Sequence, residues 1–370
     1  MTTSRHSWRQ FDFLLFGITL LLTVFGILMI HSATRDAIDP DLISRVPDQI
    51  RYTVIGVVVL FALALVDYRL LGGLHQWLYI AMLGLLILVQ FFGVEGDAGA
   101  QSWINIGIRI QPSEIAKILI IITLGHYLAK NYEKMDRVST VIKSLIHIAP
   151  PAILIFIQPD LGMAIVFAVM WLVLVWAAGL RLKHIAMFLL IISISAPFTI
   201  PLAWAQMEPY QRSRITSFLA PQSDPDAYYN INQAIISIGN GGLIGRGYTY
   251  GTQNRWRFLR VRHTDFIFSV IAEEFGFVGG MTVMVLIGVV ILRILRGARQ
   301  AADALGSLIC YGVAAFIFFQ TIVSIGMNLS LIPVTGLTLP FISSGGTSLL
   351  STLMGIGLVE SVIMRRRRLA

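Results

Sequence analysis

Ten apolar stretches, each close to twenty residues long, divide this chain of 370 residues. About 20 apolar residues in a helix cross the hydrocarbon core of a bilayer, because a helix rises ~1.5 Å per residue. The pattern predicts an all-α, polytopic integral membrane protein with ten transmembrane helices in one domain, residues 1–370. The expected spans are residues 11–31, 51–66, 77–93, 113–129, 141–157, 160–178, 184–204, 265–292, 305–331 and 340–363.

The composition excludes a soluble protein with a wetted surface. Hydrophobic residues make up 56% and charged residues only 13%, and the mean hydropathy is +0.76. The apolar runs are too long for the ~10-residue alternating strands of an outer-membrane barrel. Cys310 is the only cysteine, which excludes a disulfide framework. The first apolar run lacks a small-residue cleavage site, so we expect it to be retained as an anchor.

The distribution of basic residues predicts the orientation in the membrane. With a cytoplasmic N-terminus, sixteen of the 28 lysines and arginines fall on the inner side: Arg5, Arg9, Arg69, Lys130, Lys134, Arg137, Lys143, Arg181, Lys183, Arg293, Arg296, Arg299 and Arg365 to Arg368. This agrees with the positive-inside rule. We therefore expect both termini in the cytoplasm and a large extracellular loop at about residues 205–264. Topology rather than nucleic-acid binding explains the net charge of +8.

The most polar part of the chain leads up to the tripeptide His263-Thr264-Asp265. It carries seven arginines, namely Arg212, Arg214, Arg246, Arg255, Arg257, Arg260 and Arg262. Arginines bind anions well, so a basic loop that ends in one acid suits an anionic substrate. The alternative is a loop whose arginines attract lipid headgroups, with Asp265 merely capping a helix.

Other polar residues fall at the same predicted level of the membrane. Trp103 precedes the fourth span, Glu114 begins it, and Lys117 lies three residues further on, where the two can pair on one helix face. Asp160 lies in the turn before the sixth span. Ionisable groups at a membrane boundary are costly and tend to face a cavity or each other. These residues form either a site or an ion-pair network that locks helices together.

Two further features lie close to Asp265. Glu273 and Glu274 are adjacent acids inside a span, and we expect a structural role, such as accepting hydrogen bonds from broken helices, over a proton path. The glycine-rich run 239–247 lacks the lysine and Ser/Thr of a nucleotide loop, so flexible turns near a lipid headgroup explain it better. No metal-ligand spacing is visible. A Mg²⁺ or Mn²⁺ ion between Asp265 and a diphosphate would need only one or two carboxylates.

Motifs along most of the chain resemble those of the SEDS family (shape, elongation, division and sporulation). They are Ala100-Gln101-Ser102-Trp103-Ile104, Gln111-Pro112-Ser113-Glu114-Ile115-Ala116-Lys117, Gln158-Pro159-Asp160-Leu161-Gly162, Tyr210-Gln211-Arg212, Ser237-Ile238-Gly239, His263-Thr264-Asp265-Phe266-Ile267-Phe268, Ala272-Glu273-Glu274-Phe275-Gly276 and Leu339-Pro340-Phe341-Ile342-Ser343-Ser344-Gly345-Gly346. The short N-terminus favours the elongation type, with a division- or sporulation-type paralogue as the alternative.

The resemblance implies ten transmembrane helices and polymerisation of lipid II into glycan strands at the outer face of the cytoplasmic membrane. It also implies a class B penicillin-binding protein, a transpeptidase, as partner. The resemblance also implies roles for the residues at matching positions. Asp265 would be the essential acid, Glu114, Lys117 and Asp160 would support it, and Trp103 would lie beside the cavity. The chain departs from the family at Leu259-Arg260-Val261, where Leu-Pro-Glu is usual, so we assign no catalytic role to Val261.

The chemistry of such a reaction assigns roles to these residues. A sugar hydroxyl attacks an anomeric carbon, so one base is needed for the hydroxyl and positive charge for the departing diphosphate. We expect Asp265 to be the base and Arg212, Arg214 and Lys117 to bind the diphosphate, with Tyr210 in the same substrate-binding motif. A lipid II flippase or transporter, or a non-catalytic scaffold, are the other functions that a polar cavity among helices can serve.

Overall fold

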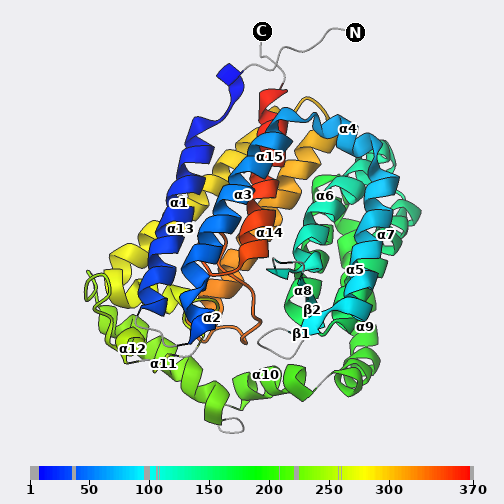
Figure 1. Cartoon of the computed structure of the whole chain (residues 1–370). Coiled ribbons are helices and arrows are strands. Elements are labelled where there is room, and N and C mark those ends of the chain that lie inside the picture. The colour runs from blue at the N-terminus through cyan, green and yellow to red at the C-terminus, as the bar shows by residue number, and fades with distance from the viewer. Residues whose placement is uncertain are drawn as a thin grey trace.

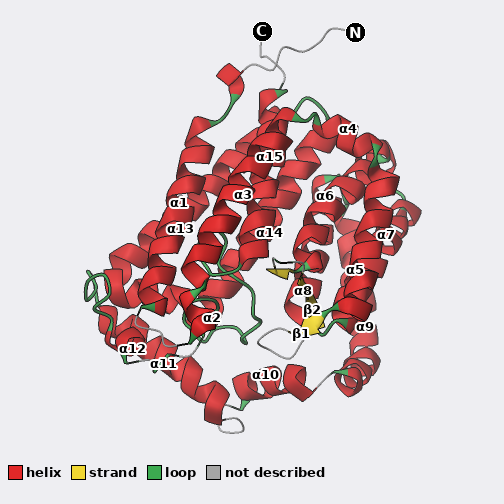
Figure 2. Ribbon diagram, in the orientation of Figure 1, coloured by secondary structure: helices red, strands yellow, loops and turns green. Residues whose placement is uncertain are grey.

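The computed structural model describes residues 8–35, 39–95, 101–105, 107, 109–207, 209–220, 225–256, 258–259 and 261–366. Helices form nearly all of the described chain, and most run roughly parallel or antiparallel in one bundle (Figure 2). The predicted all-α class is confirmed. The long helices are α1 (Phe13–Thr34), α3 (Arg45–Leu65), α5 (His75–Phe92), α6 (Pro112–Lys130), α7 (Val138–Ile157), α8 (Leu161–Ala177), α9 (Leu182–Gln206), α13 (Ile267–Gln300), α14 (Ala304–Asn328) and α15 (Gly346–Met364).

Each predicted span corresponds to one of these helices. Within the described residues, eight of them are long and apolar enough to cross a membrane: α1, α3, α5, α6, α7, α13, α14 and α15. Helix α8 is apolar but has only 17 residues, and α9 contains Pro197 and Pro201. The total of ten spans therefore stays a prediction.

The segment expected as a large loop at about residues 205–264 contains three helices: α10 (Pro209–Leu219), α11 (Pro225–Gly241) and α12 (Thr252–Arg255). Figure 1 shows them at one end of the bundle, whereas α1 begins and α15 ends at the opposite end. The remaining helices are short, namely α2 (Pro40–Ile43), α4 (Tyr68–Gly73) and the 3₁₀ turns Trp8–Gln10 and Tyr132–Lys134.

A small antiparallel sheet connects α5 to α6. Its strands, β1 (Val94–Glu95), β2 (Gln101–Asn105) and β3 (Arg109–Ile110), lie in the order β1-β2-β3. Trp103 pairs with Val94, and Asn105 pairs with Arg109. The sheet was not predicted from hydropathy, because its strands are too short to give a periodic signal.

Two helix starts differ most from those of the predicted spans. Helix α3 begins at Arg45, six residues before the predicted start, because its first turns are polar and hydropathy counts them as loop. Helix α15 begins at Gly346, whereas the span was predicted from residue 340. Phe341 has a φ of +69°, outside the region of a right-handed helix, and the hydroxyl oxygen of Ser343 accepts a hydrogen bond from the backbone N–H of Leu339 at 2.9 Å. Both differences add irregular or polar surface at the same end of the bundle.

Helix α13 breaks at Gly276, whose φ of 67° and ψ of −165° lie in a region open essentially to glycine alone. The segment that follows α11 fills the break with backbone hydrogen bonds. These run from Arg246 N to Glu273 O (3.0 Å), Gly247 N to Glu274 O (2.9 Å), Phe277 N to Gly242 O (2.8 Å) and Val278 N to Leu243 O (3.1 Å). The glycine-rich run is thus a packed element rather than a set of free turns, and these two N–H groups do not cradle a phosphate.

The adjacent acids also serve this junction. Oε1 of Glu273 accepts hydrogen bonds from Thr252 Oγ1 at 3.0 Å and from the backbone N–H of Gln253 at 2.9 Å. Oε1 of Glu274 accepts one from Ser32 of α1. Both carboxyl groups are buried; that of Glu273 joins α13 to the start of α12, and that of Glu274 joins α13 to α1. Their expected structural role as hydrogen-bond acceptors is confirmed.

We predict that Gly245→Ala destabilises the protein. A Cβ there would collide with the carbonyl of Glu274, and the φ of +84° is strained for any other residue, so we expect a loss of roughly 1–3 kcal/mol. Gly239→Ala is the control, because no atom lies within 4 Å of its Cβ position inside α11. Thermal unfolding in detergent measures both. A Gly245→Ala protein that melts with the wild type would refute the packing of this junction.

Candidate functional site

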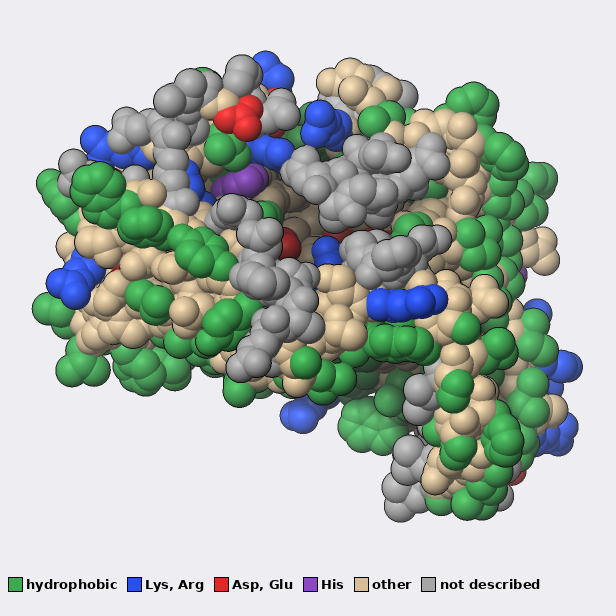
Figure 3. Space-filling view, turned by 90° about the horizontal axis from the view of Figure 1, so that it is seen from below, with side chains coloured by type: hydrophobic (Ala, Val, Ile, Leu, Met, Phe, Trp, Pro, Cys, Tyr) green, Lys and Arg blue, Asp and Glu red, His purple; other side chains and the backbone are tan. Residues whose placement is uncertain are grey.

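A cavity of about 740 Å³ opens at the end of the bundle that carries α10 to α12. Its walls come from the start of α3, the small sheet, the start of α6, the turn before α8, residue 214 of α10, residues 261–265 and the segment 335–348. Figure 3 looks onto this end and shows a hollow with acidic and basic side chains inside it. The volume lies in the range of small-molecule sites, ~300–1,000 Å³.

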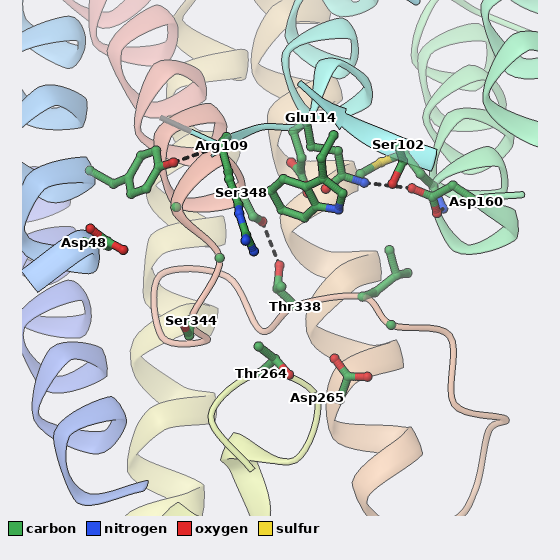
Figure 4. A pocket seen from close by; sticks show the side chains of 18 of the residues that line it. Asp48, Ser102, Arg109, Glu114, Asp160, Thr264, Asp265, Thr338, Ser344 and Ser348 are labelled. Atoms are coloured by element: carbon green, nitrogen blue, oxygen red, sulfur yellow. Dashed lines mark hydrogen bonds between the residues drawn. The ribbon is translucent and has the colours of Figure 1, made fainter. Parts of the chain in front are cut away.

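Five of the predicted site residues line this one cavity: Trp103, Glu114, Asp160, Arg214 and Asp265. They come from five separate parts of the chain, and Figure 4 shows Glu114, Asp160 and Asp265 around the same space. The structure therefore brings most of the predicted site together. Trp103 presents its indole from β2, half-buried beside the polar groups.

Three predicted residues do not line the cavity. Lys117 lies fully buried beneath it. Arg212 donates from Nη2 to the carbonyl oxygen of Ala205 at 2.9 Å and is not among the lining residues. The side chain of Tyr210 falls outside the described residues, although its backbone belongs to α10. Of the arginines expected to bind a diphosphate, only Arg214 therefore reaches the cavity.

Asp265 lies immediately before α13 but does not occupy its capping position. The helix begins at Ile267 with Phe266 as its cap residue, so the capping interpretation of Asp265 is wrong. Donors from outside the segment hold three consecutive carbonyl oxygens here. They are Ser344 N on His263 O (2.9 Å), Ser343 Oγ on Thr264 O (2.8 Å) and Asn328 Nδ2 on Asp265 O (2.8 Å). The backbone that carries the acid is thus fixed on the cavity wall.

Asp160 has both carboxylate oxygens engaged. In the turn between α7 and α8, its Oδ1 accepts from the backbone N–H of Met163 at 3.0 Å and caps α8. Its Oδ2 accepts from Nε2 of Gln111 at 2.9 Å. Burial raises the pKa of this carboxyl to about 6, and the hydrogen bond from Met163 opposes the rise. The group therefore shapes the cavity rather than reaching freely into it.

Glu114 and Lys117 form the ion pair that their spacing predicted. Nζ of Lys117 lies 2.6 Å from Oε2 of Glu114, and both side chains are almost completely buried. Ser351 of α15 donates to the same oxygen at 2.8 Å. Nζ also donates to Oε1 of Gln320 at 3.3 Å and lies 4.4 Å from the ring centroid of Phe316, both on α14. The pair therefore joins α6 to α14 and α15 directly below the cavity.

Hydropathy missed a basic and polar wall supplied by the start of α3. Arg45, Asp48, Gln49, Arg51 and Tyr52 all line the cavity. The Asp48 and Arg51 side chains pair at 3.1 Å, and this i, i+3 spacing in the sequence was the signal that the helix extends to them. The predicted span 51–66 leaves Arg45, Asp48 and Gln49 in an outer loop.

Arg109 on β3, which with Trp103 precedes the fourth predicted span, is a further basic residue of this site. It lines the cavity, and its carbonyl oxygen accepts hydrogen bonds from Tyr52 Oη (2.6 Å) and Thr347 Oγ1 (3.1 Å). These bonds connect the sheet to α3 and α15. Near it, Oγ1 of Thr338 and Oγ of Ser348 lie 2.7 Å apart (Figure 4). The cavity thus has hydroxyl groups and four arginines in its lining, namely Arg45, Arg51, Arg109 and Arg214.

Val261, where the family usually has glutamate, also lines the cavity. Its φ of +51° is unusual for a β-branched residue. Its carbonyl oxygen accepts hydrogen bonds from the backbone N–H groups of Thr264 (3.3 Å) and Phe266 (3.4 Å). The residue therefore forms a tight turn that sets the direction of the chain into Asp265, while adding no carboxylate.

We predict that Glu114→Ala and Lys117→Ala each lower the free energy of unfolding by about 3–5 kcal/mol, because each strands a buried charge. The double substitution should cost clearly less than the sum of the two. The matched control is Asp48→Ala with Arg51→Ala, a pair of the same spacing with side chains 42% and 75% exposed, for which we expect less than about 1 kcal/mol. Thermal or denaturant unfolding tests this, and strict additivity at Glu114 and Lys117 would exclude direct pairing.

Comparison with known proteins gives the family. The sequence profile of the cell cycle protein family that covers FtsW, RodA and SpoVE matches residues 12–368.

The chain is 37% identical over 359 residues to peptidoglycan glycosyltransferase MrdB of Escherichia coli K12, covering 95% of this chain and 93% of the relative. It is 36% identical over 369 residues to stage V sporulation protein E of Bacillus subtilis 168, covering 98% of both. A chain from the structure "Structural coordination of polymerization and crosslinking by a peptidoglycan synthase complex" superposes with a TM-score of 0.82 at 31% identity, covering 98% of this chain and all of that one. The protein therefore belongs to the cell cycle protein family of FtsW, RodA and SpoVE.

Proposed function

We propose that this protein is a peptidoglycan glycosyltransferase that polymerises lipid II at the outer face of the cytoplasmic membrane. The observation that carries the proposal is the cavity at one end of a membrane bundle, lined by Asp265 and four arginines. A lipid-linked sugar diphosphate has its reacting atoms at the membrane surface, where this cavity opens. Relatives of 30–40% identity that bear the name peptidoglycan glycosyltransferase support the same reaction.

The orientation belongs to the proposal. The start of α1 and the end of α15 lie at the same end of the bundle (Figure 1). Most basic residues of the connecting segments belong to that end, which the positive-inside rule assigns to the cytoplasm. We therefore assign the termini to the cytoplasm and the cavity to the outer face. The substrate would reach the cavity from the outer leaflet.

The proposed reaction needs one base. The 4-hydroxyl oxygen of the acceptor sugar attacks the anomeric carbon of the donor, and Asp265 accepts the proton of that hydroxyl. The bond between the anomeric carbon and the diphosphate oxygen breaks, and its electron pair leaves with the diphosphate. Because this leaving group is already stable as an anion, the second carboxylic acid that a glycosidase uses is not required. Glu114 and Asp160, both engaged in buried contacts, are not needed as acids.

The departing diphosphate needs positive charge. Arg214 is the expected clamp that reaches the cavity, and Arg45 and Arg109 are the additions that the structure favours, since all three line it. Guanidinium groups bind phosphate oxygens in pairs of hydrogen bonds, and they remain charged at every relevant pH. Lys117 is assigned to the ion pair with Glu114 instead.

A divalent cation would fit the site only if the phosphates of the substrate supplied some of its ligands. Among the described residues, no group of three His, Cys, Asp or Glu side chains could hold a metal ion. Mg²⁺ or Mn²⁺ is often held by one carboxylate and substrate phosphates, so Asp265 would be the protein ligand and the ion would neutralise charge on the diphosphate. Polymerisation assays with a chelator and with added Mg²⁺ test this requirement.

Elongation is the role that we propose. Division and sporulation are the alternatives, because named relatives of each type match along nearly the whole chain. We also propose a class B penicillin-binding protein as partner. The similarity to a chain of a peptidoglycan synthase complex supports this pairing. Such a partner would crosslink the strands that this chain makes.

We predict that Asp265→Asn abolishes polymerisation of purified lipid II while the protein stays folded. Loss of a general base typically lowers the rate by 10²- to 10⁴-fold. Asp136→Asn is the control, because that carboxylate is exposed and pairs at 3.7 Å with Arg181 outside the cavity. Glycan product from labelled lipid II in liposomes is the measurement. A fully active Asp265→Asn enzyme would sink the assignment, and lipid II that crosses the liposome membrane without polymer would identify a flippase.

Adding the cognate penicillin-binding protein should raise the polymerisation rate. A partner acts only through its differential affinity for the competent state, so a 100-fold rise corresponds to about 2.7 kcal/mol. An antibiotic that blocks only the transpeptidase should leave glycan synthesis running. The measurement is polymer length and rate with and without the partner. Polymer formation that survives Asp265→Ala in the complex would assign the activity to the partner and a scaffold role to this chain.

A further inference from the structure

Asn328, the last residue of α14, is fully buried against the segment that carries Asp265. Its side-chain amide makes four hydrogen bonds. Nδ2 donates to the carbonyl oxygens of Asp265 (2.8 Å) and Ser324 (2.7 Å), and Oδ1 accepts from the backbone N (3.0 Å) and the Oγ (2.7 Å) of Ser269. No motif in the sequence pointed to this residue.

These contacts use the complete hydrogen-bonding capacity of the amide, which has two N–H donors and an oxygen with two lone pairs. They also determine its orientation. The reversed amide would set its NH₂ group against the N–H of Ser269 and its oxygen against two carbonyl oxygens. A carboxylate at this position would lose both donors, and an aliphatic side chain would leave buried backbone groups without these partners.

The two backbone groups that Asn328 bridges are four residues apart. In a continuous α-helix the N–H of Ser269 would bond the carbonyl oxygen of Asp265 directly. Here that N–H reaches Phe266 O at 3.1 Å and Oδ1 of Asn328, whereas the carbonyl of Asp265 bonds Nδ2. The amide is inserted where the next helical hydrogen bond would form. The helix α13 therefore begins only at Ile267, and Asp265 stays outside it.

We propose that Asn328 is a positioning residue, whose amide holds the backbone of Asp265 out of α13 so that the carboxylate meets the acceptor hydroxyl in the cavity. This rests on the proposed role of Asp265 as the base. Asn328 does not line the cavity, so it acts through Asp265 and not on the substrate. Its contribution belongs to kcat and not to the binding of lipid II.

Two substitutions separate positioning from helix capping. Asn328→Asp keeps the acceptor for Ser269 and removes the donors, whereas Asn328→Ala removes both. A displacement of ~1 Å at a reacting group can lower a rate about 100-fold, so we expect kcat to fall about 10- to 100-fold in both variants, with KM for lipid II changed less than about twofold. Ser269→Ala removes one bond to Oδ1 only and should lower kcat far less.

The matched control is Asn131→Ala. Asn131 follows the end of α6, and its Nδ2 donates to the carbonyl oxygen four residues back, Tyr127 O, at 2.8 Å, as Asn328 does with Ser324. Asn131 is not among the residues that line the cavity, so its loss should leave kcat unchanged. Rates are measured on monodisperse protein whose melting temperature confirms folding. Lipid II binding is measured separately.

The outcomes are distinct. A folded Asn328→Asp protein with wild-type kcat would reduce Asn328 to a helix cap and overturn the positioning role. If Asp265→Asn is inactive while both Asn328 variants keep full kcat, the proposed function stands and only the positioning role fails. If Asp265→Asn is active, the proposed function itself fails. The double variant Asp265→Asn with Asn328→Ala should be no slower than Asp265→Asn alone, because both act on the same group.

Discussion

The hydrogen-bonding requirement of the backbone governs this structure. Inside a bilayer no water satisfies a peptide group, so every departure from the helix must find partners within the protein. The chain departs from helical geometry at Gly276, at residues 261–266 and at residues 335–345. At each place distant parts of the chain supply the missing bonds. The irregular backbone that forms the cavity is therefore stabilised by specific tertiary contacts rather than by local sequence.

This requirement explains why so many polar residues near the cavity are structural. Glu273 accepts a hydrogen bond from Thr252 of α12, Glu274 accepts one from Ser32 of α1, and Asp160 caps α8 while bonding Gln111. Glu114 neutralises Lys117 and accepts a hydrogen bond from Ser351. Each of these acids has a partner that its burial demands. At Asp265 the backbone carbonyl oxygen accepts the hydrogen bond from Asn328, and the side chain lines the cavity.

The cavity also combines two kinds of surface that suit a lipid-linked sugar diphosphate. Arginines from α3, β3 and α10 supply charge for an anion, and hydroxyl groups of Thr338 and Ser348 supply polar contacts beside them. The half-buried Trp103 adds an aromatic face. These groups come from segments far apart in the chain, and the packing of α15 against α3, α6 and α14 holds together the cavity walls that α3, α6 and α15 supply.

The sequence alone determined the class of protein and the approximate position of its long helices. The length of an apolar segment is a local property, and the thickness of the bilayer sets the length that a spanning helix needs. Local spacing also predicted the pair of Glu114 and Lys117. Roles that depend on distant partners were not predictable. The spacing of Asp48 and Arg51 indicates a helix but not the cavity that it lines, the glycine run does not reveal the break that it fills, and Asn328 belongs to no motif. Only the tertiary structure decided that Arg214 reaches the cavity while Arg212 does not, and that Asp265 lies outside its helix. Those outcomes depend on hydrogen bonds and packing between residues that are far apart in the sequence. Hydropathy and local spacing carry no information about such long-range contacts.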